Sequence, residues 1–375
     1  MDSDQNPSKT KPYVAESHPL ETVGGLVHPH QLEVQDFSAY ALIVDARADR
    51  DFADDHIPAA VNLPVLSDDQ HAEVEAQIAA DRDRALQIGA GHARSTMAAH
   101  LGPVFAELAP GERVLVYGAG GDMRGALCAD ALRDFGYVVD ELLGGWRSYR
   151  RWVSAGLTVL PRLFLLRVLG GPVSCGQSRL LTELSRQGQQ TLDLMQIAAH
   201  YGSLLGPQLD QHQPPQPLFE SLLLDALRHR DAWRPLWVMA ARATLGALQL
   251  PVELFDAIQR APTYEVTAPM TERITFWSET YPQDAADPLR MVEGFASKVH
   301  LIGSVRLIDW RRLALAGQTD SLVEEVLTRE DEIAATRSVD AATPRPASRA
   351  TIHLASREGS IIAAAVVGLQ AHPDG

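Results

Sequence analysis

Residues 113–135 read RVLVYGAGGDMRGALCADALRDF, and this stretch decides the fold. An apolar run from Arg113 to Tyr117 leads into a glycine-rich turn from Gly118 to Arg124, and helical spacing follows from Ala126 to Phe135. A short apolar run that ends in a turn predicts a buried strand, and the glycines permit a tight entry into the helix. Strand, turn and helix in this order indicate an α/β unit with a parallel sheet.

The same pattern continues on both sides of this stretch. Short apolar strands are expected at residues 41–45 and 138–143, and the Ala-rich, charged residues 68–108 predict helices on the surface of the sheet. These elements predict an N-terminal α/β domain over residues 23–156. A polar arm over residues 1–22, without periodicity, precedes it and is expected to be flexible.

A second strand, turn and helix begins after this domain. The strand is expected at 163–169, the turn at 170–177 and the helix at 178–186. Further segments with helical spacing extend this second domain over residues 157–337. Residues 338–375 predict a linker and a C-terminal tail, in which 351–369 fits a strand pair or a helix equally well.

The composition excludes several classes of protein. The net charge of −15 weighs against general nucleic-acid binding, which relies on Lys and Arg at the phosphates, but it leaves room for a local basic face. No apolar run approaches the roughly 20 residues of a membrane-spanning helix. The acidic start differs from the basic and then apolar start of a signal peptide. With two cysteines and no disulfide framework, we expect a cytoplasmic protein without membrane contact.

Motif residues around the first turn resemble the signature of rhodanese-like domains. They are Asp45-Ala46-Arg47, Asp51-Phe52, the HIPAAVNLP of residues 56–64, and Leu143-Gly144-Gly145-Trp146. The offsets between these groups agree with the signature from residue 45 to residue 146. The resemblance implies a sulfur-transfer fold in which a nucleophilic cysteine ends the central strand. Backbone N–H groups of the following turn lower the pKa of that thiol.

Gly118 occupies the place of that cysteine. A glycine supplies neither a thiolate nor a persulfide, so no catalytic residue is intact at this turn. The other rhodanese-loop candidates are Asp45, Arg47, Gly120, Gly121 and Arg124. Cys128, about one helical turn beyond Arg124, is expected to be a small buried hydrophobic residue and not a substitute nucleophile.

The second turn has the spacing of the phosphate-binding pattern G-x-x-x-x-G-K-[ST], between a predicted strand and a helix. Its candidate phosphate-binding residues are Gly171, Ser174, Cys175, Gly176, Gln177 and Ser178. In such P-loops backbone N–H groups hold phosphates and the lysine adds a positive charge. Gln177 stands at the lysine position without a charge, so we expect weak nucleotide and diphosphate affinity. No metal and no certain cofactor follow from these residues.

The residues beyond the second turn resemble the bacterial tRNA 2-selenouridine synthase family, whose members join a rhodanese domain to a P-loop domain. The matching stretches are Leu192–Leu194, Ala198–Ser203, Gln213–Gln216, Phe219–Glu220, Arg234–Val238 with Arg242, and Arg260–Pro262. They add Asp193, His200, Ser203 and Arg242 as substrate or tRNA candidates. The resemblance predicts an N-terminal rhodanese-like parallel-sheet domain followed by a P-loop-type α/β domain with a helical C-terminal part.

The resemblance also implies a reaction, the exchange of selenium for sulfur at the wobble 2-thiouridine of tRNA through a geranylated intermediate. Its substrates would be selenophosphate and geranyl diphosphate, and its partner tRNA. Charged family positions are replaced here by Met195, Tyr201, Met239 and Ala241, in addition to the missing cysteine and lysine. Two hypotheses follow: an enzyme with impaired activity, and a catalytically silent paralogue that binds tRNA or a partner protein. A P-loop NTPase with an added rhodanese-like module is disfavoured by Gln177.

Overall fold

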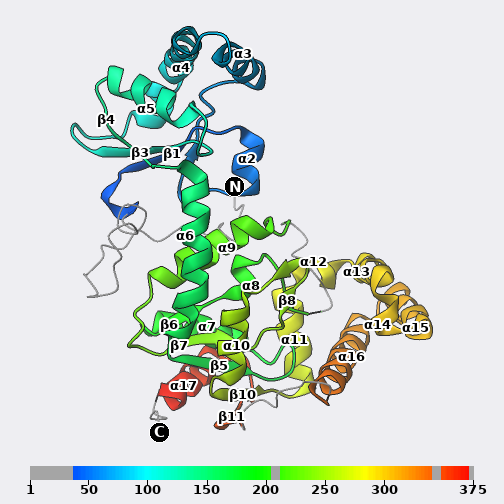
Figure 1. Cartoon of the computed structure of the whole chain (residues 1–375). Coiled ribbons are helices and arrows are strands. Elements are labelled where there is room, and N and C mark those ends of the chain that lie inside the picture. Colours follow the sequence, from blue (N-terminus) through cyan, green and yellow to red (C-terminus); the bar gives the residue numbers. More distant parts are fainter. Residues whose placement is uncertain (1–36, 204–211, 340–347, 371–375) are drawn as a thin grey trace, which may run out of the picture. The chain divides into compact units, whose positions relative to one another are not determined.

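The computed structural model describes residues 37–203, 212–339 and 348–370, and the chain divides into two compact units (Figure 1). The first unit comprises residues up to Leu157 together with Pro215–His229, and the second comprises Thr158–Pro214 and Arg230 onward. The expected N-terminal arm, residues 1–22, lies outside the described residues. None of the helices in the described ranges has the length and apolar character that crossing a membrane requires.

The first unit is built on a four-stranded parallel sheet with the order β2-β1-β3-β4. Its strands are β1 (Leu42–Asp45), β2 (Val61–Asn62), β3 (Arg113–Tyr117) and β4 (Val138–Glu141). In the register of the central pair, Val44 lies opposite Val116, and both are fully buried. The central strands are apolar on both faces because helices cover both sides of the sheet.

Helices of the first unit include one that comes from a distant part of the chain. They are η1 (Phe37–Ala39), α2 (Asp49–Asp54), α3 (Asp68–Ile78), α4 (Arg82–Phe105), α5 (Arg124–Asp134), α6 (Gly145–Val159) and α9 (Gln216–Arg228). The start of α3 is fixed by a capping box in which Ser67 and Gln70 satisfy each other's backbone N–H groups. Helix α9 follows residues of the second unit in the chain, yet it packs within the first.

The second unit contains a five-stranded parallel sheet with the order β11-β10-β5-β7-β6. Its strands are β5 (Leu166–Gly170), β6 (Gln190–Leu192), β7 (Leu236–Met239), β10 (Thr263–Thr267) and β11 (Ala350–His353), with a separate hairpin of β8 (Thr244–Leu245) and β9 (Leu248–Gln249). Because all five strands are parallel, the segments that follow them meet at one edge of the sheet. That carboxyl edge is where α/β folds place their ligands.

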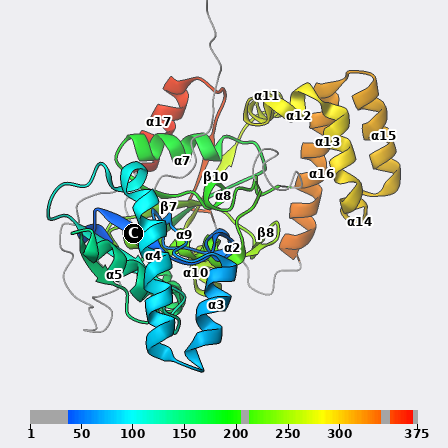
Figure 2. The same ribbon diagram turned by 90° about the horizontal axis from the view of Figure 1, so that it is seen from above.

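Helices of the second unit fall into two groups. Those on the sheet are η2 (Leu160–Arg162), α7 (Gln177–Arg186), α8 (Leu194–Ile197), α10 (Val252–Arg260) and α17 (Gly359–Gln370), and Figure 2 shows α17 beside α7. The others share a core of their own around Trp277, Phe295 and Trp310 (Figure 2). They are α11 (Met270–Thr280), α12 (Pro282–Ala286), α13 (Pro288–Gly294), η3 (Phe295–Lys298), α14 (Val299–Ile302), α15 (Ser304–Leu315) and α16 (Thr319–Val339).

The fold class that the sequence predicts is confirmed, but four segments differ from the expectation. The strand expected from Leu163 begins at Leu166, because η2 continues the turn beyond α6. The helical stretch 288–300 breaks into α13, η3 and α14. The stretch 351–369 contains one strand and one helix, since β11 pairs with β10 and α17 packs on α7. The expected linker begins inside α16, and its residues 340–347 lie outside the described residues.

Candidate functional site

The first candidate site is the turn that follows β3. The closing segment at residues 144–146 packs directly against it, and the Trp146 N–H donates to the Gly118 carbonyl at 2.9 Å. A Cβ atom on Gly120, whose φ is +93°, would lie 2.0 Å from the Gly144 carbonyl oxygen. Only glycine fits such a contact in that conformation. The turn after β3 and the closing segment at residues 144–146 therefore pack backbone against backbone.

The space at position 118 is filled by the turn's own residues. A Cβ atom on Gly118 would lie 2.7 Å from the Gly125 nitrogen and 2.9 Å from Oδ1 of Asp122. That carboxylate oxygen is buried and has no hydrogen-bond partner within the described chain. Its other oxygen accepts a hydrogen bond from Nε of Arg124 at 2.5 Å. An acidic side chain thus lies where a persulfide anion would need space. The same side chain forms an ion pair with Arg124, so this positive charge is already neutralised.

Asp45 and Arg47 lie beneath the turn as part of the buried scaffold. Oδ1 of Asp45 accepts hydrogen bonds from the backbone N–H of Arg47 at 2.9 Å and from its Nε at 3.0 Å, while Nη2 of Arg47 donates to the Asp55 carbonyl at 2.5 Å. The guanidinium also lies 5.1 Å from the ring centroid of Trp146. These contacts stabilise the turn and its closing segment, and they leave neither side chain at the surface.

A buried acid that the sequence did not single out, Asp55, ties three elements together. Its carboxylate accepts hydrogen bonds from Nε1 of Trp146 at 2.9 Å and from Oγ of Ser221 in α9 at 2.6 Å. Arg150 lies 3.5 Å away and also pairs with Glu220 of α9. The only signal in the sequence was its place directly before the HIPAAVNLP stretch. Through Asp55 and Arg150, α9 is tied to other elements of the first unit.

Cys128 is the buried hydrophobic residue that the sequence predicts. Its side chain is fully buried in the core of the first unit, and burial raises the pKa of the thiol to about 12. A thiol with this pKa carries almost no thiolate at neutral pH. It cannot replace the missing nucleophile.

The second candidate site is the P-loop after β5. Gly171 has a φ of +118°, and a Cβ atom there would lie 2.1 Å from the Val266 carbonyl oxygen of β10. Ser174 also has a positive φ, of 60°, which is uncommon for a residue other than glycine. The turn therefore has a strained, closely packed backbone at the start of α7, the place in an α/β fold where anions can meet free N–H groups.

The side chains of Gln177 and Ser178 make contacts that do not suit the binding of a nucleotide with its Mg²⁺ ion. Nε2 of Gln177 donates to the Pro172 carbonyl at 2.7 Å, which closes the loop on itself. The Ser178 hydroxyl lies 3.5 Å from Sδ of Met239 at the end of β7. A thioether is a poor ligand for Mg²⁺, which prefers oxygen. Among the described residues no group of three His, Cys, Asp or Glu side chains is placed to hold a metal.

Cys175 lies inside the loop in sequence, but its side chain points into the core. It is 1% exposed and packs in the cluster of Leu169, Leu180 and Val266. Burial raises the pKa of its thiol, and the charge of Arg273 offsets this only in part. The thiol is thus a poor candidate for a reacting group at a bound phosphate.

Asp193, His200 and Ser203 follow β6 at the same carboxyl edge. Oδ1 of Asp193 caps α8 by accepting from the N–H groups of Met195 and Gln196, and burial raises the pKa of this carboxyl. His200 is 4% exposed, and its Nδ1 accepts from the Gly202 N–H at 2.7 Å. Ser203 is buried as well. His200 and Ser203 therefore lie below the surface of this edge, whereas Asp193 is partly exposed.

Arg242 follows β7 and meets charged residues from the helical group. Its Nη2 lies 3.7 Å from Oε2 of Glu330 in α16, whose side chain is 2% exposed. The next residue, Asp331, accepts two hydrogen bonds from Arg273, at 2.7 and 2.9 Å. Nε of Arg273 in turn donates to the Val173 carbonyl of the P-loop at 3.0 Å. Helix α16 is thereby connected to both the P-loop and Arg242.

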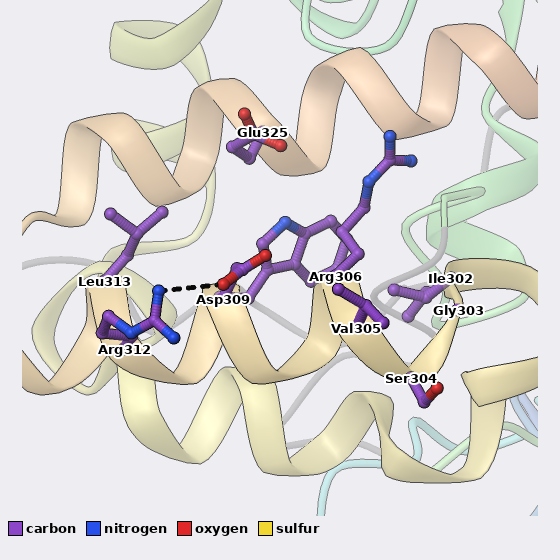
Figure 3. Close-up of a pocket in the computed structure, with 10 residues that line it drawn as sticks. Ile302, Gly303, Ser304, Val305, Arg306, Asp309, Arg312, Leu313 and Glu325 are labelled. Carbon is purple, nitrogen blue, oxygen red and sulfur yellow. Dashed lines mark hydrogen bonds and ion pairs between the residues drawn. The ribbon is translucent and has the colours of Figure 1, made fainter.

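A groove with a cavity volume of about 750 Å³ lies among α14, α15 and α16 (Figure 3). Arg312 at its rim pairs with Asp309 at 3.0 Å, and Arg306 pairs with Glu332 at 2.8 Å. None of the candidate residues of either turn lines it. Its charges are already neutralised by neighbours, so the groove offers no strong feature for an anionic ligand.

Comparison with known proteins matches both units. The model of the rhodanese-like domain matches residues 30–151, and that of the tRNA 2-selenouridine synthase AAA domain matches residues 165–311. Curated relatives described as tRNA 2-selenouridine synthase include those of Hahella chejuensis, 29% identical over 69% of this chain and 68% of the relative, and Hydrogenovibrio crunogenus, 27% identical over 65% and 68%. The relative from Aeromonas salmonicida is 28% identical over 64% of this chain and 65% of its own length.

Proposed function

The chain belongs to the tRNA 2-selenouridine synthase family, and from this membership we propose that it recognises tRNA but has lost the selenium-carrying step. The observation that carries this proposal is the state of position 118. A carrier must form a bond from a cysteine sulfur to the transferred chalcogen, and Gly118 has no side chain with which to form it.

The surroundings of Gly118 support loss of the step and not relocation of the nucleophile. Asp122 occupies the space beside the Cα of Gly118, and Cys128 is buried with a raised pKa. Cys175 also points into a core and away from the surface. The second turn keeps the glycines of its pattern and leads into α7, so we infer that the part of the reaction that needs a phosphate-bearing substrate has lost less than the rhodanese part.

We propose recognition of tRNA from family membership. We also propose that the protein acts in the cytoplasm. The silent-paralogue hypothesis is the strict form of this proposal, in which neither selenium nor geranyl transfer remains. An NTPase reaction is disfavoured because Met239 stands beside Ser178 where a metal would need oxygen ligands.

The decisive experiment expresses the gene in cells that lack their own synthase and measures tRNA nucleosides by mass spectrometry. We expect 2-thiouridine to persist without 2-selenouridine, while an intact relative expressed in parallel restores 2-selenouridine. Geranylated 2-thiouridine would identify a retained first step and exclude the silent form. Detection of 2-selenouridine would overturn the proposal.

A separate measurement tests tRNA recognition. Filter binding with purified protein and a 2-thiouridine-containing tRNA should show an affinity that falls with salt, because phosphate contacts release counterions. A double-stranded DNA of similar length is the control. Equal affinity for DNA, or no binding to tRNA at low salt, would refute recognition of tRNA.

A further inference from the structure

The side chain of Trp233 is exposed to solvent in the loop that leads into β7. It is 83% exposed, the highest exposed fraction of any large apolar side chain in the described ranges. Of the six tryptophans in the chain, Trp237, Trp277 and Trp310 are by contrast at most 1% exposed. An indole ring in water is unfavourable because most of its surface is apolar. Trp233 is therefore a candidate contact for another molecule.

Hydrogen bonds hold the backbone around Trp233 in place. The Trp233 N–H donates to Oδ1 of Asp231 at 2.9 Å, and the Asp231 N–H donates to Oε1 of Gln190 at 2.6 Å. Nε2 of Gln190 donates back to the carbonyls of Asp231 and Arg234, at 2.9 and 3.2 Å. Nη2 of Arg234 donates to the Gly188 carbonyl at 2.7 Å. Because the backbone under the ring is already fixed, binding there needs little ordering of the loop.

Two exposed leucines lie at the same edge of the sheet as Trp233. Leu163 and Leu165, just before β5, are 43% and 54% exposed. Strands β5 and β7 are parallel neighbours, and the Leu236 N–H donates to the Leu165 carbonyl at 2.9 Å. The starts of both strands therefore form the amino edge of the sheet, whereas the P-loop is at the carboxyl edge. The exposed apolar residues at this edge are thus separate from the P-loop.

The arginines on both sides of Trp233 in the sequence are not neutralised by ion pairs. Arg234 is exposed and Arg230 is half-buried, and both donate to backbone carbonyls. Within the described part of the chain, neither has a carboxylate at ion-pair distance, whereas the exposed Arg311 pairs with Glu293. A carbonyl accepts a hydrogen bond from a guanidinium but leaves its charge in place. The loop therefore carries positive charge beside an apolar ring, in a chain whose net charge is −15.

We propose that this loop binds an unpaired stretch of RNA, with a base stacked on the Trp233 ring and the adjacent phosphates held by Arg230 and Arg234. Stacking needs an exposed aromatic face and tolerates any base. Charge complementarity favours RNA over a protein partner, because arginines without acidic partners match a phosphate backbone. The proposal rests on the proposed function for the class of ligand, and it adds a contact at the edge of the sheet opposite the P-loop.

Fluorescence anisotropy with the purified full chain and a short labelled oligouridine tests the role of the ring. We expect Trp233→Ala to weaken binding by about tenfold or more, because a stacked base loses its platform, whereas Trp233→Phe keeps an aromatic face and should stay within about threefold. Leu315→Ala, which truncates a side chain that is 69% exposed in α15, is the matched control and should bind like the original chain. Unchanged affinity in Trp233→Ala would overturn the proposal and leave the surface to a protein partner.

Urea denaturation of the same variants checks that the fold is intact. Because the indole is exposed, Trp233→Ala should unfold at the same urea concentration as the original chain. Weaker RNA binding at unchanged stability then reports the lost contact and not a folding defect. A stability loss in Trp233→Ala equal to its loss in RNA binding would contradict a direct contact.

The salt dependence of the titration tests the two arginines. Arg230→Gln and Arg234→Gln should each weaken binding by about threefold to tenfold and reduce the slope of log affinity against log salt by about 0.7, the value for one phosphate of a single strand. Arg311→Gln, which removes an arginine paired with Glu293, is the matched control and should keep the original slope. Unchanged slopes in Arg230→Gln and Arg234→Gln would overturn the phosphate contacts of this loop.

Titration with a tRNA separates this proposal from the proposed function. If tRNA binds equally to the original chain and to Trp233→Ala, the RNA surface is wrong and tRNA recognition stands. If the oligouridine binds through Trp233 but tRNA does not bind, tRNA recognition is wrong and the RNA surface stands.

Discussion

The turn after β3 and the turn after β5 share one construction, a parallel strand, a glycine-rich loop and the start of a helix. In the first turn the reacting residue is absent, and Asp122 lies within 2.9 Å of where its Cβ would be. In the second turn the lysine is absent, but Arg242 follows the neighbouring strand β7 at the same sheet edge. A lost nucleophile cannot be supplied from a distance because it must form a bond, whereas a lost charge can be, since electrostatic attraction acts over several ångströms.

The largest expected effect concerns the buried network that closes the first turn. Asp55→Ala removes the acceptor for Trp146 and Ser221 and leaves Arg150 without that charge, so we expect the free energy of unfolding to fall by about 3–5 kcal/mol. Urea denaturation measures this loss. The exposed neighbour gives the control variant Asp54→Ala, which should change stability by less than about 0.5 kcal/mol. Equal losses in both variants would show that the network is not specific.

The second test uses the pH dependence of the other region. His200 has a pKa of about 4 in the folded chain, below the ordinary value of 6.5, so the unfolded chain binds its proton first as pH falls. Its contribution to stability is complete above pH 6.5 and is lost as pH falls toward 4. The original chain should therefore lose about 2–3 kcal/mol more than His200→Gln between pH 7.5 and 4.5. His300→Gln, at an exposed position of α14, is the control, and parallel curves for His200→Gln and the original chain would contradict the prediction.

A cysteine introduced at position 118 tests whether Asp122 suppresses the reactivity of a thiol in the first turn. Gly118→Cys alone places a thiol against the Asp122 carboxylate and the Gly125 nitrogen, so we expect slow alkylation and no sulfur transfer from thiosulfate. The double variant Gly118→Cys with Asp122→Ala should be alkylated more than about tenfold faster at pH 7, because removal of a neighbouring negative charge lowers a thiol's pKa. The original chain, with buried Cys128 and Cys175, gives the background rate. Equal rates in the single and double variants would argue against a role for Asp122.

The smallest expected effect comes from restoring the P-loop lysine. Gln177→Lys should strengthen pyrophosphate binding by only about threefold to tenfold, because the added charge replaces a side chain whose hydrogen bond to the Pro172 carbonyl closes the loop. Gln187→Lys, at the far end of α7, is the control for a general change in charge. Calorimetry distinguishes the outcomes, and a gain of several hundredfold would mean that loss of the Gln177 hydrogen bond does not offset the added charge.

Much of the fold was predictable because short apolar strands and glycine-rich turns are local patterns. The strand Arg113–Tyr117 has the predicted bounds, and the spacing at Gly171–Ser178 correctly placed a turn between β5 and α7. Contacts across long separations were not predictable in this way. No pattern in the residues around Asp55 predicts its hydrogen bond to Ser221, 166 residues away. Nor does any such pattern predict that α9 belongs to the first unit.

By itself the sequence determined that Gly118 and Gln177 lack the thiol and the amine that their motifs require, because residue type alone decides which bonds and charges a position can supply. Only the tertiary structure decided which side chains surround each of these two positions. It placed the Asp122 carboxylate against Gly118, turned the Cys175 thiol into a core, and put Glu330 near Arg242. Burial and proximity depend on how distant segments pack, and that packing has no signature in any one stretch of the chain.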